Sequence, residues 1–359
     1  MGGGPGLAIG TTIAPDGTLW VVGVDAPGKL FVQTSSDLGK HWYARRQLPI
    51  DHDTPAADGD SRPKIAFGPD GRVAISYTQP LAKPYTGAIR MLRSSDGGAT
   101  FSAPFTVHGD RQVITHRFDA IAFDRAGNLH TLWIDKRDQV SAGKAGYRGA
   151  AVYRNESRDG GITFGPDIKM ADHSCECCRI ALAPTVSGGV AALWRAVFAP
   201  NVRDHAFAVI GGAPVRASFD DWHLDACPHH GPGLAMAADG GFHAVWFGER
   251  DGRMAVRYGR LAADGTPNIS VVRELPDPRA EHADVAAIGR RVAVVWRSFD
   301  GTRTHLRAWV SADDGANFVL LDLAETDNAN DQPHLLASEL GFVAVWRNNR
   351  EIRVVPIAE

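Results

Sequence analysis

The sequence repeats one unit along most of its length, and this repeat limits the choice of fold more than any other feature. Each unit has an apolar segment, a turn and a second apolar segment. Copies occupy residues 65–77, 121–133, 182–194, 234–246, 285–296 and 335–346, and residues 7–23 form a seventh. Six copies end in an aromatic residue, and these are Tyr77, Trp133, Trp194, Trp246, Trp296 and Trp346. Short strand-like segments with a period of about 50 residues are typical of radial β repeats.

A second motif, Ser-x-Asp-x-Gly-x-x-aromatic, occurs at 35–42, 94–101, 157–164 and 311–318. It suits a tight hairpin, because the Asp carboxylate accepts backbone N–H groups, the glycine takes a positive φ and the aromatic ring packs between sheets. The motif resembles the BNR/Asp-box repeat of the sialidase-like β-propellers. This resemblance implies structural Asp residues on the face opposite the usual ligand site, namely Asp37, Asp96, Asp159 and Asp313.

The repeat and the resemblance together predict an all-β protein, a β-propeller with four-stranded antiparallel blades. Seven strand pairs in 359 residues favour seven blades, with six blades, as in sialidases, as the alternative. Because the period continues through the chain, we expect a single domain over residues 1–359. The last repeat ends after its third strand, at residues 351–359.

Cysteine and histidine gather in the loops that lead into the first strand of each repeat. Aligning the repeats on their aromatic ends puts His116, Cys177 and His229 at one position, together with Asp60 and Glu281. The next position holds Arg117, Cys178, His230 and His282, and Cys175 and Cys227 lie in the same loops. Such loops converge on one face of a propeller.

Thiols and imidazoles together form a donor set suited to copper or zinc. We therefore predict a metal site built from Cys175, Cys177, Cys178, Cys227, His116, His229, His230 and His282, with copper as the first choice and zinc as the alternative. Two disulfides, for example one that joins Cys227 to the 175–178 group, are the competing interpretation, and a third is that the thiols are inert.

An arginine follows the aromatic residue in three repeats, at Arg195, Arg297 and Arg347. Three guanidinium groups could clamp a carboxylate, as the arginine triad of sialidases does, although arginines that cap strand ends in solvent would give the same pattern. The aromatic-Arg-Ile-Pro motif of that family is absent, and the nearest string is Cys178-Arg179-Ile180-Ala181. No tyrosine is assignable as the nucleophile that a sialidase needs.

Composition removes other classes of function. A formal net charge of -3 gives no electrostatic excess for nucleic acid or anionic lipid, and no apolar run approaches the roughly 20 residues of a membrane span. The run Met1–Gly4 is typical of an engineered or truncated start, so a removed export signal stays open. We expect a periplasmic or secreted protein that binds a metal ion for sequestration, sensing or delivery. A glycan or a partner protein is a further partner to consider, and the alternative function is a sialidase-like glycoside hydrolase or a lectin.

Overall fold

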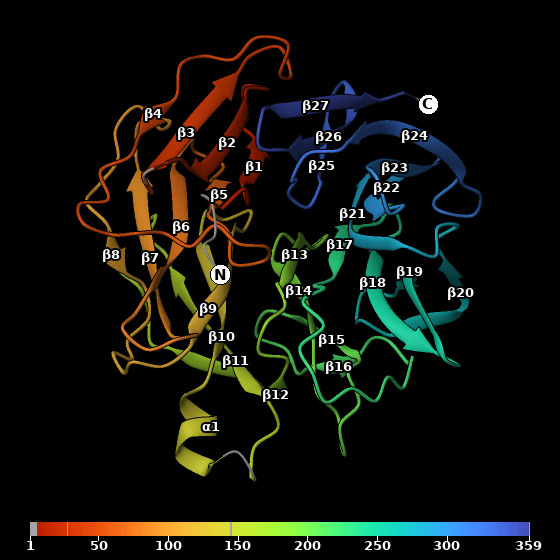
Figure 1. Cartoon of the computed structure of the whole chain (residues 1–359). Helices are drawn as coiled ribbons and strands as arrows, with labels where there is room; N and C mark the ends of the chain where they lie inside the picture. Colours follow the sequence, from red (N-terminus) through yellow and green to blue (C-terminus); the bar gives the residue numbers. More distant parts are fainter. Residues whose placement is uncertain (1–5, 27, 144–145, 359) are drawn as a thin grey trace. The chain divides into compact units, whose positions relative to one another are not determined.

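A computed structural model describes residues 6–26, 28–143 and 146–358, and the Met1–Gly4 run lies outside them. Over these residues the chain forms seven antiparallel sheets and one helix of six residues (Figure 1). Within the same part of the chain, no helix has the length and apolar character needed to cross a bilayer. The fold divides into two compact units, one ending at Ile180 and one beginning at Ala181.

The first unit contains three sheets, each formed by strands in chain order. The first sheet is made of β1 (Gly10–Ile13), β2 (Leu19–Val24), β3 (Leu30–Ser35) and β4 (Arg46–Gln47). The second consists of β5 (Lys64–Phe67), β6 (Val73–Pro80), β7 (Gly87–Ser94) and β8 (Phe105–Thr106). The third comprises β9 (His116–Phe123), β10 (Leu129–Asp135), β11 (Ala150–Ser157) and β12 (Ile168–Ser174), with helix α1 (Arg137–Ala142) between β10 and β11.

The second unit contains four sheets with the same chain order. The fourth sheet is made of β13 (Ala181–Pro184), β14 (Val190–Arg195), β15 (His205–Val209) and β16 (Val215–Arg216). The fifth consists of β17 (Gly233–Met236), β18 (Phe242–Arg250), β19 (Arg253–Leu261) and β20 (Pro267–Glu274). The sixth comprises β21 (Ala280–Ile288), β22 (Arg291–Phe299), β23 (Thr304–Ser311) and β24 (Val319–Thr326), and the seventh comprises β25 (His334–Ser338), β26 (Gly341–Arg347) and β27 (Ile352–Ile357).

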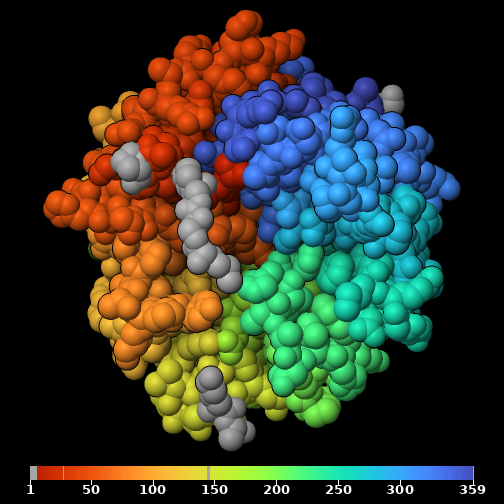
Figure 2. Space-filling view, in the orientation of Figure 1, coloured from red at the N-terminus to blue at the C-terminus, as the bar shows by residue number. Residues whose placement is uncertain are grey.

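This succession of seven antiparallel sheets is that of a seven-bladed β-propeller. The predicted all-β fold with seven blades is therefore confirmed, and the alternative of six blades is wrong. The last sheet has three strands in the described residues, as expected from the sequence. The space-filling view follows the chain order within each unit, from red to yellow in the first and from green to blue in the second (Figure 2). The prediction of one domain over the whole chain stays a prediction.

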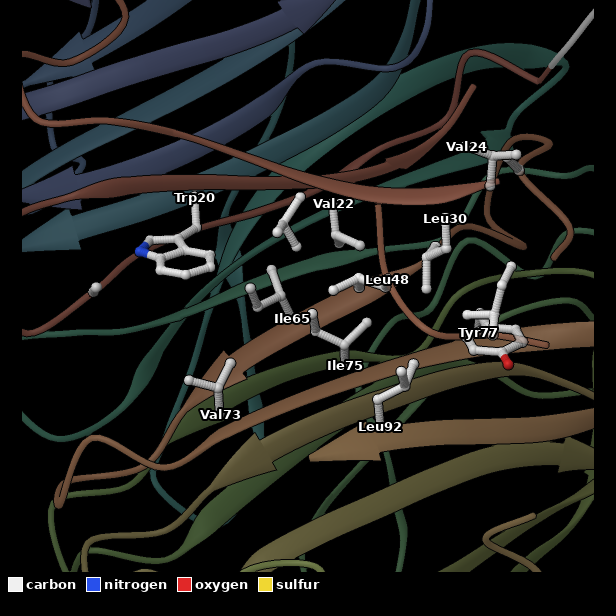
Figure 3. Packing of buried hydrophobic residues seen from close by; sticks show 14 residues of the cluster. Trp20, Val22, Val24, Leu30, Leu48, Ile65, Val73, Ile75, Tyr77 and Leu92 are labelled. Carbon is white, nitrogen blue, oxygen red and sulfur yellow. The ribbon is translucent and has the colours of Figure 1, made fainter. Parts of the chain in front are cut away.

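Within each unit, the core lies between the faces of consecutive sheets. In the first unit, apolar residues of the first and second sheets pack together, among them Val22, Leu30, Ile75 and Leu92 (Figure 3). The aromatic residue near the end of each second strand is a large part of these cores. Four of these tryptophans have an exposed fraction of 1% or less, namely Trp133, Trp194, Trp296 and Trp346. The aromatic ends of the repeats are therefore the anchors between sheets.

The four Asp-box turns have one shared geometry. In the box of the first sheet, the Ser35 hydroxyl donates to Asp37 at 2.8 Å, and the backbone N–H of His41 donates to the same carboxylate at 2.8 Å. Bonds from the side chain and backbone of Asn317 lower the pKa of Asp313 to about 2. In the third sheet, Ser157 begins the box at the end of β11, whereas His116 begins β9 at the other end of the sheet. This placement of the Asp box, at the end of the sheet away from His116, is consistent with the structural role predicted for the four Asp residues.

We expect the substitution Ile75→Ala to destabilise the protein by about 2–5 kcal/mol, because it opens a cavity in the core between the first two sheets. Ile75 is fully buried there. Denaturant unfolding followed by circular dichroism measures the change. Val113→Ala is the matched control, since Val113 is 42% exposed, and it should change stability by no more than about 0.5 kcal/mol. Equal effects of the two substitutions would contradict the described core.

Candidate functional site

The cysteine loop, residues 175–179, lies at what we call the leading end of the third sheet, the end at which its first strand begins. Ser174, the last residue of β12, pairs with Ala150, and Ala151 pairs with Asp135. Asp135 in turn pairs with His116, the first residue of β9. The register therefore carries the cysteines to the end of the sheet that is remote from its Asp box.

Cys175, Cys177 and Cys178 form the thiol cluster. Their sulfur atoms are 3.7 Å apart for Cys175 and Cys177, 3.5 Å for Cys175 and Cys178, and 4.0 Å for Cys177 and Cys178. These separations exceed the roughly 2.05 Å of a disulfide bond. All three side chains are buried, with exposed fractions of 1%, 6% and 2%. The structure thus brings three of the predicted metal ligands together as thiols.

Polar contacts hold the cysteine loop on both sides. The backbone N–H of Arg179 donates to Asp60 Oδ2 at 3.1 Å, and its guanidinium contacts the other carboxylate oxygen at 3.3 Å. On the other side, Glu176 forms an ion pair with Lys136 and accepts a hydrogen bond of 3.1 Å from Gln139. The loop is therefore held by the segment that leads into β5 and by the region of α1. The alignment of the repeats placed Asp60 at the same position as Cys177, whereas nothing in the sequence indicated the contacts with Lys136 and Gln139.

His116 was predicted as a metal ligand, and its described contacts are with a buried polar group of the first unit. Its ring stacks on His108 with centroids 4.0 Å apart, and its Nε2 lies 3.6 Å from Asp110 and 3.7 Å from Asp135. Burial lowers the pKa of His116, opposed by the two carboxylates. Burial and then repulsion from His116 lower the pKa of His108 to about 4. Both rings are therefore neutral near pH 7.

The His108 ring makes the folded state sensitive to mild acid. Because its pKa in the folded protein lies below the ordinary value of 6.5, the unfolded chain binds the proton first, and stability falls as the pH decreases from about 6.5 to about 4. We expect this group to cost about 2 kcal/mol between pH 7 and pH 5. Denaturant unfolding at the two pH values should show a smaller loss in His108→Gln than in the unchanged protein.

His52→Gln is the matched control for this experiment, because His52 is exposed. It should leave the difference between pH 7 and pH 5 unchanged. An unchanged difference in His108→Gln would show that the buried ring does not govern the acid response.

The second unit brings another set of predicted ligands together. One ligand atom from each of His230, Glu281 and His282 lies within 4.8 Å of the others, and all three residues are half-buried. The ring of His230 stacks on His282 with centroids 4.3 Å apart and on Phe247 with centroids 4.2 Å apart. Glu281 also contacts Arg297, from its Oε1 to the Nε atom at 3.0 Å. We call His230, Glu281 and His282 the histidine–glutamate cluster.

A β-bulge in β21 explains how consecutive residues reach one cluster. Glu281 pairs with Arg297 and Asp284 pairs with Val295, so two residues of β21 stand opposite one residue of β22. His282 lies in the bulge with φ of +52°. Side chains of consecutive strand residues normally point to opposite faces, and a bulge changes this direction. The bulge therefore allows Glu281 and His282 to contribute to the same group.

The register also corrects the alignment of the repeats. His116 pairs with Asp135, which lies two residues after Trp133. In the sixth sheet, the residue two positions after Trp296 is Ser298, and Ser298 pairs with Ala280. His116 thus corresponds to Ala280, and Arg117 corresponds to Glu281. The sequence alignment placed these residues one position off because the turn between β9 and β10 differs in length from the turn between β21 and β22.

The two remaining predicted ligands lie in the segment between β16 and β17. Cys227 is exposed. His229 is also exposed and has φ of +55°. Their part in a metal site stays a prediction.

The three predicted arginines all lie in the second unit, at the ends of second strands. Arg195 is buried and donates to the backbone carbonyls of Arg203 at 2.9 Å, His230 at 3.0 Å and Phe247 at 2.6 Å. Besides Glu281, the guanidinium of Arg297 contacts the carbonyl of Asn330 at 3.0 Å. Arg347 is 8% exposed. Arg195 and Arg297 thus hold protein groups in place, and an anion-binding role for the three stays a prediction.

Three tyrosines donate hydrogen bonds to Asp carboxylates, at 2.5 Å for Tyr77 and Asp53, 2.6 Å for Tyr147 and Asp172, and 2.9 Å for Tyr153 and Asp138. Burial, followed by the hydrogen bond to the carboxylate, raises the pKa of all three. These hydroxyls are therefore protonated donors near neutral pH.

Comparison with known proteins identifies the fold of this chain but no family. No family model matches the chain, and no curated protein matches it significantly. Among solved structures, an ulvan lyase bound to the saccharide GlcA(1-4)Rha3S matches 99% of this chain and 94% of its own, with a TM-score of 0.61 and 12% identity. An α-L-arabinanase of Penicillium chrysogenum complexed with arabinobiose matches 81% of this chain and 88% of its own, with a TM-score of 0.54 and 13% identity.

An intramolecular trans-sialidase of Ruminococcus gnavus is also similar, over 82% of this chain and 90% of its own, with a TM-score of 0.51 and 10% identity. At such identities the likeness concerns the fold and not the activity. The predicted resemblance is confirmed at that level: this chain has the fold of the sialidase-like, arabinanase and polysaccharide lyase β-propellers.

Proposed function

We propose that the protein binds a thiophilic metal ion through the thiol cluster of Cys175, Cys177 and Cys178. The observation that carries the proposal is the size of the sulfur triangle. A point equidistant from three sulfur atoms with the observed separations is about 2.2 Å from each of them, close to the ~2.3 Å of a metal–thiolate bond. An ion would therefore fit between the sulfur atoms with little movement of the loop.

The donor set favours copper(I) over zinc. Thiolates are soft ligands and select copper(I), zinc and iron–sulfur clusters. Structural zinc sites almost always have four protein ligands, whereas copper(I) accepts a planar set of three thiolates. The cluster supplies three, so zinc would require a fourth donor.

Burial supports sequestration or delivery rather than catalysis. Exposed fractions of 6% or less leave the sulfur atoms little access for a substrate. The proposal includes a periplasmic or secreted location, in which bound metal would protect the thiols from oxidation to a disulfide. Because thiols lose protons when they bind the ion, affinity should fall in acid.

The double substitution Cys177→Ser with Cys178→Ser tests the proposal. Reduced protein should take up one copper(I) ion per chain and gain melting temperature, because a ligand that binds only the folded state stabilises it. The double variant should lose that gain and keep the melting temperature of the metal-depleted protein within a few degrees. Differential scanning calorimetry with and without copper(I), together with elemental analysis, measures both effects.

Glu176→Gln is the matched control, because Glu176 stands in the same loop and its carboxylate contacts Lys136 and Gln139. It should retain copper uptake. The proposal fails if reduced protein shows no thermal shift with copper(I) or zinc, and if mass spectrometry finds the cysteines in disulfides.

Binding of an acidic glycan is the second candidate, favoured by the match of 99% of the chain to a lyase bound to a glucuronate-containing saccharide. Arg297 and Arg347 are the cationic groups that would meet the carboxylate. Hydrolysis of a sialoside is not expected from the same site. The Arg-Ile-Pro motif of sialidases is absent, and the three buried tyrosines described above are protonated donors to Asp carboxylates.

We therefore expect a fluorogenic sialoside to be hydrolysed no faster than the background rate. The measurement is a fluorescence assay over several hours with a known sialidase as the positive control. Turnover that disappears in Arg297→Ala or Arg347→Ala would instead favour the glycosidase function.

A further inference from the structure

The histidine–glutamate cluster has the composition of a metal site of a different kind from the thiol cluster. Its donors are two imidazole nitrogens and one carboxylate oxygen, all within 4.8 Å of one another. Two histidines and one carboxylate bind zinc in sites that keep a fourth position for water or substrate, and they also bind iron(II). We infer that His230, Glu281 and His282 bind a divalent cation of the zinc class with coordination positions left for an outside oxygen ligand.

The backbone adopts an unfavourable conformation where it brings these donors together. A non-glycine residue at positive φ is held in a sparsely populated conformation, and such residues cluster at functional sites. His282 has φ of +52° and lies in the bulge that places it beside Glu281. A bulge of this kind also occurs in β9, at Phe118, whose φ is +55°. The third and sixth sheets therefore share this bulge, and in the sixth sheet the residue at positive φ is a histidine.

Neighbouring residues orient the donors. Arg297 contacts the Glu281 carboxylate at 3.0 Å and is itself held by the Asn330 carbonyl at 3.0 Å. The ring of His230 stacks between Phe247 and His282, and its carbonyl accepts a bond from Arg195 at 3.0 Å. Outer partners of this kind fix the orientation of metal ligands. Arg297 is thus a positioning residue for the carboxylate.

Exposure distinguishes this cluster from the thiol cluster. The three residues are half-buried, so an ion bound there would remain accessible to a small oxygen ligand. Water or a carboxylate group is the ligand class that a zinc-like ion accepts in an open position.

The test uses the full chain with the thiol cluster removed by Cys175→Ser, Cys177→Ser and Cys178→Ser. In that background, failure of the proposed copper site has no bearing on the result. Cobalt(II) is the probe, because its visible absorption reports the coordination geometry, and isothermal titration calorimetry with zinc measures stoichiometry. We expect one ion per chain and a tetrahedral or five-coordinate cobalt spectrum.

Substitutions in the same background identify the ligands. Glu281→Gln retains the shape of the side chain, and His282→Asn retains a residue that tolerates positive φ. Each should weaken binding at least about tenfold. His230→Gln removes the ligand that lies outside β21, in the segment before β17, so the outcome does not depend on the folding of one variant. His223→Gln is the matched control, because His223 is exposed and lies in the same segment between β16 and β17 as His230, and it should bind as the background does.

Circular dichroism and the melting temperature establish that each variant is folded. The assignment is overturned if the background protein takes up no cobalt(II) or zinc. It is also overturned if folded Glu281→Gln and His282→Asn variants bind as tightly as the background, or if His223→Gln loses binding to the same extent.

Discussion

Face-to-face packing between consecutive sheets of the same unit is the interaction on which the rest of the structure depends. Each sheet can bury both faces only if a neighbour covers them, and the large aromatic residues of the second strands fill the space between. Trp133 and Trp296 are fully buried in this way. In β9 and β21 the bulge stands directly opposite these tryptophans. In these two sheets the bulge of the first strand therefore lies beside the aromatic residue that packs between sheets.

The fold could be predicted from the sequence because its determinants are local and repeated. Aromatic strand ends and Asp boxes each recur, and a box such as Ser35 to His41 makes its hydrogen bonds within seven residues. Register could not be predicted equally well. Because the hairpins differ in length, the alignment of the repeats matched His116 with Glu281, whereas the strand register matches it with Ala280. This error of one residue matters, because in a strand one residue decides the face to which a side chain points.

The candidate sites show the same division between local and distant information. Three cysteines within four residues are readily recognised as a group, and the structure brings their sulfur atoms within 4.0 Å. The contact of Arg179 with Asp60 joins residues 119 positions apart. Similarly, the sequence indicates that His230 and His282 occupy equivalent loops, but the bulge that adds Glu281 depends on pairing with β22. Backbone geometry formed by tertiary contacts leaves no short motif in the sequence.

The two clusters divide the donor atoms of the chain by hardness and by access. Sulfur donors are gathered in a buried loop held by ion pairs, whereas nitrogen and oxygen donors are gathered in a half-buried group held by Arg297 and by stacked rings. Soft thiolates bind copper(I) in preference to harder ions, and imidazole with carboxylate suits divalent ions of the zinc class. Thiolates also bind zinc, so copper(I) distinguishes the two clusters better than zinc does. In a propeller, the loops can carry different side chains while the packed strands beneath them keep their register, so each cluster can have its own donor set without a change in the strands.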